Sequence, residues 1–333
     1  MLITLIIIFC LFILILILFK KKKEISLDGS KVIVFGGSSG IGLEIVRIFQ
    51  KRGCQVIIAS RKPRIDSPGP GIDFLSIDLT QPYEKVKTTL GTFFSANSLP
   101  NIIINSAGIS YPSYFIESNP QEWETMMDLN VMSSLKISKY FIPQISELKS
   151  SPKRLCFISS MAGQVSLYGF AAYSSSKFAL RGFADALKME LLHHNDVKLT
   201  LAFPPDTKTP GYDRENLTKP FITQKLSESG GLARAEDVAS IIVSDVVNGY
   251  YFSWYDLTGF LLTLTTGGMH NSILFDRING KVPTFISLML LPVLLILEAL
   301  LTALARLIGL IQAELWNFQV SKLIKQEEPK KKM

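Results

Sequence analysis

The chain of 333 residues carries a formal net charge of +7, with 35 Lys and Arg against 28 Asp and Glu. This length suits one α/β domain with attachments and is long enough to bury a full core. The three cysteines show neither metal-site spacing nor a disulfide framework, so we expect no metal and a reducing compartment. Lysine clusters at 20–23 and 330–332 flank apolar segments, which favours anionic lipid over nucleic acid as their partner.

The first segment, residues 2–19, consists almost wholly of Leu, Ile and Phe. As a helix it spans about 27 Å, close to the hydrocarbon thickness of a bilayer. A cleaved signal peptide is the alternative, but no basic region precedes the segment and no small-residue cleavage site follows it. The lysines at 20–23 predict that this end faces the cytosol. We therefore expect a transmembrane anchor over 1–23 and a cytosolic catalytic domain over 28–270.

A short β-branched run, residues 31–35, predicts a buried strand, and a glycine-rich loop follows it. Apolar residues then recur at helical spacing over 43–49. A strand, a glycine loop and a helix in this order are the setting of a dinucleotide site, where the helix N-terminus offers N–H groups to a pyrophosphate. A Gly/Ser-rich turn without function is the alternative. The loop residues that we expect to bind a dinucleotide are Gly36, Ser38, Ser39, Gly40, Ile41 and Gly42.

Strands and helices alternate through the rest of the domain. The same patterns predict strands over 53–59, 72–77, 102–104, 155–158 and 198–203, and helices over 83–94, 122–145, 171–193 and 235–247. This alternation predicts an α/β fold with a Rossmann-type, doubly wound parallel sheet and right-handed crossovers. Residues 208–232 are polar and spaced by Gly and Pro, so we expect an irregular loop that covers the substrate.

Tyr173 and Lys177 stand four residues apart in a predicted helix and therefore share one of its faces. An ammonium beside a phenol favours the phenolate, so we expect a lowered tyrosine pKa and proton exchange with a substrate oxygen. Ser160 lies upstream, at the end of a predicted strand. The Tyr/Lys spacing alone occurs by chance in many chains, and it gains weight from the glycine-rich loop.

With this loop and the Tyr/Lys pair, the chain resembles the short-chain dehydrogenase/reductase family over about residues 29–250. Four further stretches match the pattern of that family, at 105–108, 128–131, 159–160 and 204–210. Two residues depart from it: Phe35 stands where Thr is frequent, and Pro205 stands where Gly is usual. The second departure changes the loop that lies beside the nicotinamide in this family.

The resemblance implies a reductase in which hydride reaches a ketone carbon. Tyr173 would donate a proton to the ketone oxygen, and Ser160 would donate a hydrogen bond to it. Lys177 would hold the nicotinamide ribose, and Asn130 would position a water beside the lysine. The further cofactor contacts that the resemblance implies are Asp78 at the adenine, Asn105, Ala107 and Gly108 along the cofactor, and Thr209 at the carboxamide. Asp78 also suits a helix N-cap.

The second predicted strand ends at Ser60 and Arg61, without the carboxylate that an NAD-preferring site places there. Arg61 can pair with a 2′-phosphate, because its planar guanidinium donates two parallel hydrogen bonds. Lys62 and Arg64 add positive charge, and an ordinary basic loop is the alternative. We therefore predict NADPH as the cofactor.

Residues 280–313 are again strongly apolar but contain Glu298 and Arg306, which are costly in a lipid-facing span. The segment is too short for two crossings. Lysines three and four places from the chain end resemble the cytosolic dilysine signal for retrieval to the endoplasmic reticulum, with a solvated basic end as the alternative. We expect a re-entrant or monotopic segment, a cytosolic tail over 314–333, and a place in the endoplasmic reticulum membrane.

This membrane setting favours a lipid ketone as substrate. The runs 204–211 and 215–220, together with the two apolar segments, resemble the subgroup that reduces 3-dehydrosphinganine to sphinganine in sphingolipid synthesis. A membrane-bound retinoid or hydroxysteroid dehydrogenase is one alternative. A catalytically idle membrane scaffold is another, against which the intact Ser160, Tyr173 and Lys177 argue. Family members often pair through the helix that carries the tyrosine, so a homodimer is possible.

Overall fold

The computed structural model describes residues 26–62, 69–149, 152–194, 196–267, 273–278 and 284–331. They belong to two compact units, a larger one built on residues 27–260 and a smaller one built on residues 261–317. The predicted anchor over 1–23 and Arg64 lie outside the described residues.

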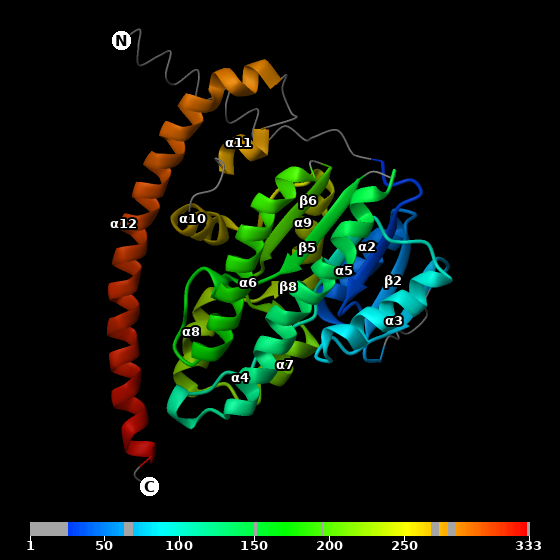
Figure 1. Cartoon of the computed structure of the whole chain (residues 1–333). Coiled ribbons are helices and arrows are strands. Elements are labelled where there is room, and N and C mark those ends of the chain that lie inside the picture. The colour runs from blue at the N-terminus through cyan, green and yellow to red at the C-terminus, as the bar shows by residue number, and fades with distance from the viewer. Residues whose placement is uncertain are drawn as a thin grey trace. The chain divides into compact units, whose positions relative to one another are not determined.

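A seven-stranded sheet forms the centre of the larger unit, in the order β3-β2-β1-β4-β5-β6-β9 (Figure 1). Each neighbouring pair is parallel, which confirms the predicted Rossmann-type sheet. The strands are β1 (Lys31–Phe35), β2 (Gln55–Ser60), β3 (Ile72–Ser76), β4 (Ile102–Asn105), β5 (Lys153–Ile158), β6 (Val197–Phe203) and β9 (Phe252–Trp254). Strands β1, β4 and β5 are buried along their whole length, as expected where helices cover both faces of a sheet.

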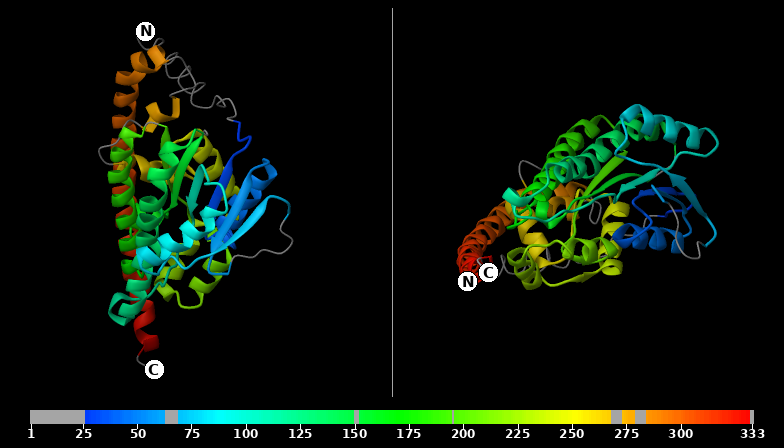
Figure 2. Two further views of the ribbon diagram at one scale, coloured as in Figure 1. Left: turned by 45° about the vertical axis from the view of Figure 1, so that its right-hand side comes forward. Right: turned by 90° about the horizontal axis from the view of Figure 1, so that it is seen from below.

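The helices form a layer on each face of this sheet (Figure 2). Helices α2 (Gly40–Lys51) and α9 (Ala235–Asn248) pack together on one face. Helices α3 (Tyr83–Ser95), α5 (Ser133–Glu147) and α6 (Ala171–Glu190) cover the other face. In open α/β sheets of this kind, ligands bind at the carboxyl ends of the strands.

The predicted helix over 122–145 is interrupted. It consists of α4 (Pro120–Met127), the π-helical turn η2 (Asp128–Met132) and then α5. Single π turns inside α-helices occur frequently at functional sites. This turn carries Asn130, so the interruption falls on a residue that the sequence had already singled out.

The expectation of an irregular loop over 208–232 was wrong. The segment folds into α7 (Pro210–Asn216) and α8 (Phe221–Gly230), and its ends pair as the short strands β7 (Thr207–Lys208) and β8 (Ala233–Arg234). Pro210 opens α7 at a position where a missing N–H does no harm. The prolines that suggested an irregular loop are therefore helix-start residues.

The C-terminal helix α12 (Thr284–Lys331) is continuous over 48 residues and follows α11 (Ile273–Ile278). Its residues up to Asn317 belong to the smaller unit. The helix extends over about 70 Å at about 1.5 Å per residue. The part from Leu291 to Ile324, with a mean hydropathy of 2.2, is long and apolar enough to cross a membrane. A re-entrant path needs a turn, and the described residues 284–331 contain none. The helix is likewise unbroken at residue 314, where the cytosolic tail was expected to begin.

Glu298 lies within this apolar helix and has partners for its charge. Its two carboxylate oxygens accept hydrogen bonds from the backbone N–H groups of Ile273 and Leu274, each at 3.1 Å. These groups belong to the start of α11, where unpaired N–H groups favour a negative charge. The contact explains how a carboxylate is accommodated in an otherwise apolar helix.

Candidate active site

The predicted site residues meet at the carboxyl edge of the sheet, where β1 and β4 are neighbours. The crossovers from these two strands run in opposite directions, which opens a crevice at the switch point of such a sheet. The glycine-rich loop follows β1, and Ala107 and Gly108 follow β4.

Backbone contacts require glycine at two positions of the loop. Gly36 has a φ of +75°, and a Cβ there would lie 2.8 Å from the backbone nitrogen of Ala107. A Cβ on Gly42 would lie 2.4 Å from the carbonyl oxygen of Gly36. Ser39 is the N-cap of α2 but makes no capping hydrogen bond through its side chain, which leaves the first N–H groups of the helix available to a ligand. This cradle suits a pyrophosphate.

The residues expected at the adenine end lie together. The hydroxyls of Ser38 and Ser60 are 2.7 Å apart, so the glycine loop meets the end of β2. Arg61 is exposed at this point. Burial pushes the pKa of the Asp78 carboxyl up, but hydrogen bonds from Thr80 and the charge of nearby Arg61 outweigh it and hold that pKa below its usual value. Asp78 is therefore ionised beside Arg61, in a local turn with Thr80 rather than at a helix N-cap.

Asn105 stabilises the backbone of the site through three hydrogen bonds. Its side-chain amide donates to the hydroxyls of Ser133 and Ser134, each at 2.8 Å, and its oxygen accepts from the backbone N–H of Ala107 at 3.1 Å. These bonds fix the turn after β4 against the start of α5. Gly108 lies beyond it, where a Cβ would approach Lys177 Nζ at 3.5 Å.

Asn130 uses its position in the π turn to connect two segments of the site. Its oxygen accepts from the backbone N–H of Ile109 at 2.8 Å, and its nitrogen donates to the carbonyl of Ile109 at 2.9 Å. The same nitrogen donates to the Ser176 hydroxyl at 2.9 Å, which in turn donates to the Tyr173 carbonyl at 2.7 Å. Asn130 thus holds the catalytic turn of α6 against the loop after β4.

Ser160, Tyr173 and Lys177 converge as the sequence predicted. The side chains of Ser160 and Tyr173 are hydrogen-bonded to each other. Lys177 is buried, with its Nζ donating to the Ile158 carbonyl at 3.1 Å and lying 5.7 Å from the centre of the Tyr173 ring. A phenol, a hydroxyl and an ammonium in this arrangement can hold a ketone oxygen and protonate it.

The expectation that Lys177 lowers the pKa of Tyr173 was wrong. Burial raises the tyrosine pKa above its usual value, and the negative charges of Glu215 and Asp206 raise it further. Burial also lowers the pKa of Lys177 to about 8. A low-dielectric site disfavours both charged forms. Tyr173 is therefore a neutral phenol at physiological pH, which is the form that donates a proton.

Thr209 brings the segment after β6 to the glycine loop. A Cβ on Gly40 would lie 3.1 Å from the Thr209 methyl carbon. The Thr209 hydroxyl oxygen accepts from the backbone N–H of Tyr212 at 3.1 Å and so caps α7. The residue expected at the carboxamide thus also serves as the N-cap of α7.

The motifs gave no role to a buried group of charges beside Tyr173. Lys219 Nζ lies 2.8 Å from Glu215 Oε1, and their side chains are only 1% and 13% exposed. Asp206 interacts with the same ammonium. Burial raises the pKa of both carboxyls, and Lys219 opposes the rise. The spacing of Glu215 and Lys219, four residues apart, was the available signal for an ion pair.

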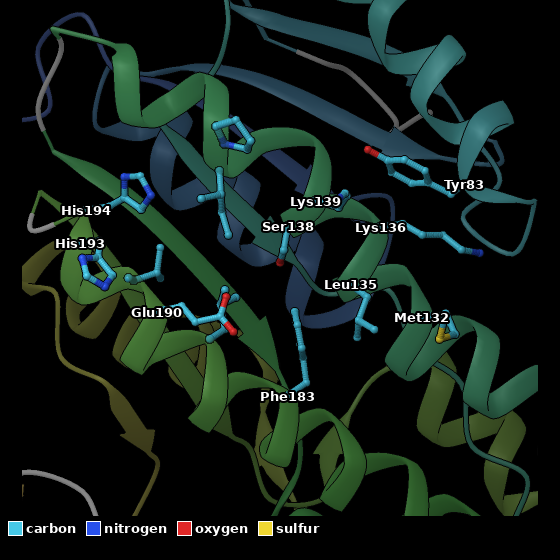
Figure 3. Close-up of a pocket in the computed structure, with 14 residues that line it drawn as sticks. Tyr83, Met132, Leu135, Lys136, Ser138, Lys139, Phe183, Glu190, His193 and His194 are labelled. Atoms are coloured by element: carbon cyan, nitrogen blue, oxygen red, sulfur yellow. The ribbon is translucent and has the colours of Figure 1, made fainter.

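A pocket of about 720 Å³ opens elsewhere, between α5 and α6 (Figure 3). Its lining is mostly apolar and includes Leu135, Ile142, Phe183 and Leu187. His193 lies in the turn after α6 and also lines this pocket. The pocket shares none of its described lining residues with the predicted catalytic set, so it is separate from the site at the sheet edge.

Comparison with known proteins agrees with this geometry. Residues 30–219 match the family model for short chain dehydrogenases. The chain is 34% identical over 261 residues to a 3-dehydrosphinganine reductase of Danio rerio, covering 75% of this chain and 78% of the relative. It is 36% identical, with the same coverage, to a 3-ketodihydrosphingosine reductase of Bos taurus. A short chain dehydrogenase from Burkholderia cenocepacia, solved in complex with NADP, superimposes with a TM-score of 0.60 at 18% identity, over 74% of this chain and 95% of that one.

Proposed function

The chain belongs to the short-chain dehydrogenase family, and from this premise we propose that it reduces 3-dehydrosphinganine to sphinganine with NADPH. The observation that carries the proposal is the identity of 34–36% with relatives named for this reaction, over 261 residues that include the whole catalytic set. 3-Ketodihydrosphingosine, the substrate in the name of the second relative, is the same compound.

The cofactor cradle fits a nicotinamide dinucleotide. The glycine loop leaves space at Gly36 and Gly42 that a Cβ would fill, and the start of α2 offers N–H groups to phosphate. Arg61, at the end of β2, would bind the 2′-phosphate that distinguishes NADPH from NADH. Asp78 would accept hydrogen bonds from the adenine side, since it is ionised there.

The chain's own residues supply the acid half of the reaction. When bound, the reduced nicotinamide supplies the hydride. The Ser160 hydroxyl, held by the backbone N–H of Ala162 at 3.1 Å, donates a hydrogen bond to the ketone oxygen. Tyr173 gives its phenolic proton to the same oxygen as negative charge develops there. Lys177, anchored at the Ile158 carbonyl with its Nζ 5.7 Å from the centre of the Tyr173 ring, would hold the nicotinamide ribose.

A substrate comparison tests the proposal. Detergent-solubilised protein is incubated with NADPH and 3-dehydrosphinganine, a steroid ketone or retinal, and the loss of NADPH absorbance is followed. We expect turnover with 3-dehydrosphinganine that exceeds turnover with the other ketones. Preferred turnover of the steroid or of retinal would instead identify a hydroxysteroid or retinoid dehydrogenase, and no turnover of any ketone would support a scaffold.

Arg61→Asp should change the cofactor preference. Hydrogen bonds to a charged group contribute about 1.5–3 kcal/mol, so we expect the KM for NADPH to rise by about tenfold to a hundredfold. The KM for NADH should change far less, because NADH has no 2′-phosphate. Lys198→Asp, on the exposed part of β6, is the matched charge control. Equal changes in the KM values for NADPH and NADH would show that Arg61 does not bind the 2′-phosphate.

We also propose that the protein resides in the endoplasmic reticulum membrane with its catalytic domain in the cytosol. The apolar helix over Leu291–Ile324 and the lysines at 330 and 331 support this placement. We expect protease added to sealed microsomes to digest the catalytic domain without detergent. A domain that is protected until detergent is added would place it in the lumen.

A homodimer is the remaining proposal about partners. Family members often pair through the helix corresponding to α6, and here α6 and α5 flank the apolar pocket of Figure 3. We expect light scattering of the detergent-solubilised protein, corrected for detergent, to give twice the chain mass of 37.1 kDa. A mass equal to one chain at working concentration would rule the dimer out.

A further inference from the structure

The proposed substrate, on which this inference rests, suggests a binding role for the charged side chains beside Tyr173. 3-Dehydrosphinganine carries an amino group on the carbon next to its ketone, and that group is largely an ammonium at neutral pH. A residue that binds the ammonium must therefore lie close to the residue that protonates the ketone oxygen. We propose that Glu215 binds the ammonium group of the substrate and so selects an amino ketone over a simple long-chain ketone.

Position is the first argument. Glu215 lies on α7, and Thr209, which caps that helix, packs against the glycine loop. The carboxylate lies close enough to Tyr173 for its charge to act on the phenol, and it acts more strongly than Asp206 does. The Lys219 ammonium that pairs with Glu215 lies 5.7 Å from the centre of the Phe170 ring, and the centres of the Phe170 and Tyr173 rings are 5.6 Å apart. The ion pair is therefore near Tyr173.

The balance of charge is the second argument. Buried charges in proteins are almost always paired. Glu215 and Asp206 share one ammonium, that of Lys219, so this buried group among the described residues has one carboxylate in excess. Lys219 is the cation that acts on both carboxyls, and Lys177 has no such effect on either of them. A cationic ligand would neutralise the negative charge of the excess carboxylate.

Hydrogen bonding selects Glu215 as the carboxylate that receives the ligand. Asp206 already has the Ser227 hydroxyl and Lys219 as partners. Glu215 Oε1 is buried, and among the described residues its carboxylate contacts Lys219, at 2.8 Å, and the Ser110 hydroxyl, neither contact being a well-aligned hydrogen bond. The buried Ser110 hydroxyl oxygen is likewise without a well-aligned partner there, and it lies beside the same carboxylate. An ammonium has three N–H donors and would satisfy both oxygens.

Binding at Glu215 would also affect the chemistry. Glu215 raises the pKa of Tyr173, and an ammonium paired with Glu215 would offset that effect. Tyr173 would then donate its proton more readily to an amino ketone than to a neutral ketone. The selection should therefore appear in kcat as well as in KM.

The test compares two substrates and two variants. The substrates are 3-dehydrosphinganine and its desamino analogue, in which hydrogen replaces the amino group. We expect the wild-type protein to prefer the amino ketone in kcat/KM. Glu215→Gln should lower kcat/KM for the amino ketone by about tenfold to a hundredfold, because a charge-assisted contact is lost. It should not lower kcat/KM for the desamino ketone and should raise it to the extent that the Glu215 charge raises the Tyr173 pKa in the wild-type protein. Glu228→Gln, an exposed carboxylate on α8, is the matched control and should keep the wild-type preference.

Each outcome decides between the possibilities. An equal fall with both substrates would assign Glu215 a purely structural part, and a wild-type protein without preference would also overturn the inference. Wild-type protein that does not reduce 3-dehydrosphinganine at all would instead overturn the proposed function. Melting curves show whether Glu215→Gln is folded. If it is not, Ser110→Ala serves as the second variant, and an unchanged preference in that variant would contradict the inference.

Discussion

Replacing Tyr173 with phenylalanine is expected to lower kcat for ketone reduction by about a hundredfold to ten-thousandfold, the usual contribution of a positioned general acid. The phenol is hydrogen-bonded to Ser160, and burial keeps it protonated, which supports the proposed role of Tyr173 as the proton donor. The ring should keep its packing against Phe170, whose ring centre lies 5.6 Å away. NADPH affinity should therefore change by no more than about twofold to threefold, while turnover collapses.

Single-turnover and fluorescence titration measurements separate these effects. Tyr168→Phe is the matched control, because Tyr168 is exposed on the segment that leads into α6 and packs edge-on against Tyr114. That variant should keep wild-type kcat. If Tyr173→Phe retained more than about a tenth of wild-type kcat, another group would be the proton donor.

Gly36→Ala is expected to have the second-largest effect and to act on cofactor binding and stability together. A left-handed backbone costs a residue with a Cβ about 1–2 kcal/mol. At Gly36 the added carbon would also lie 2.8 Å from the Ala107 backbone, so the loop would have to move. We expect a loss of stability of about 2–5 kcal/mol and a loss of most NADPH affinity.

Two other glycines separate backbone strain from the contact with Ala107. Gly29 and Gly53 have φ angles of +71° and +78°, and a Cβ at either position meets nothing within 4 Å. Gly29→Ala and Gly53→Ala should therefore lose only the cost of the left-handed backbone and keep NADPH binding. Thermal melts with and without NADPH measure both quantities. Similar losses in all three variants would show that the approach of Gly36 to Ala107 is unimportant.

The central sheet and the proximity of Ser160, Tyr173 and Lys177 could be predicted because their signals are local. Buried strands such as β1 and β4 read as continuous β-branched runs, since both faces of a parallel sheet are covered. The glycine loop indicates a dinucleotide site because a strand precedes it and a helix follows it. Tyr173 and Lys177 share a helical face because of their spacing, and the structure places them together.

The charges around the site could not be predicted, because they depend on contacts between distant segments. Spacing placed Lys177 near Tyr173 but did not show that Lys177 would be buried and Tyr173 half-buried, nor that the charge of Glu215 on α7 would act on the phenol. These contacts reverse the expected direction of the tyrosine pKa shift. The π turn at Asn130 was hidden for a similar reason, because the flanking residues are apolar at ordinary helical spacing and its bonds are to Ile109 and Ser176.

Transfer of deuterium from NADPH to the lipid tests the central claim most directly. The protein is incubated with 3-dehydrosphinganine and NADPH that carries deuterium at the transferable position, and the product is identified by mass spectrometry. Our account predicts sphinganine with a single deuterium on the carbon that bore the ketone, formed in step with the NADPH consumed. Recovery of unreduced 3-dehydrosphinganine while another ketone takes up the deuterium would contradict it.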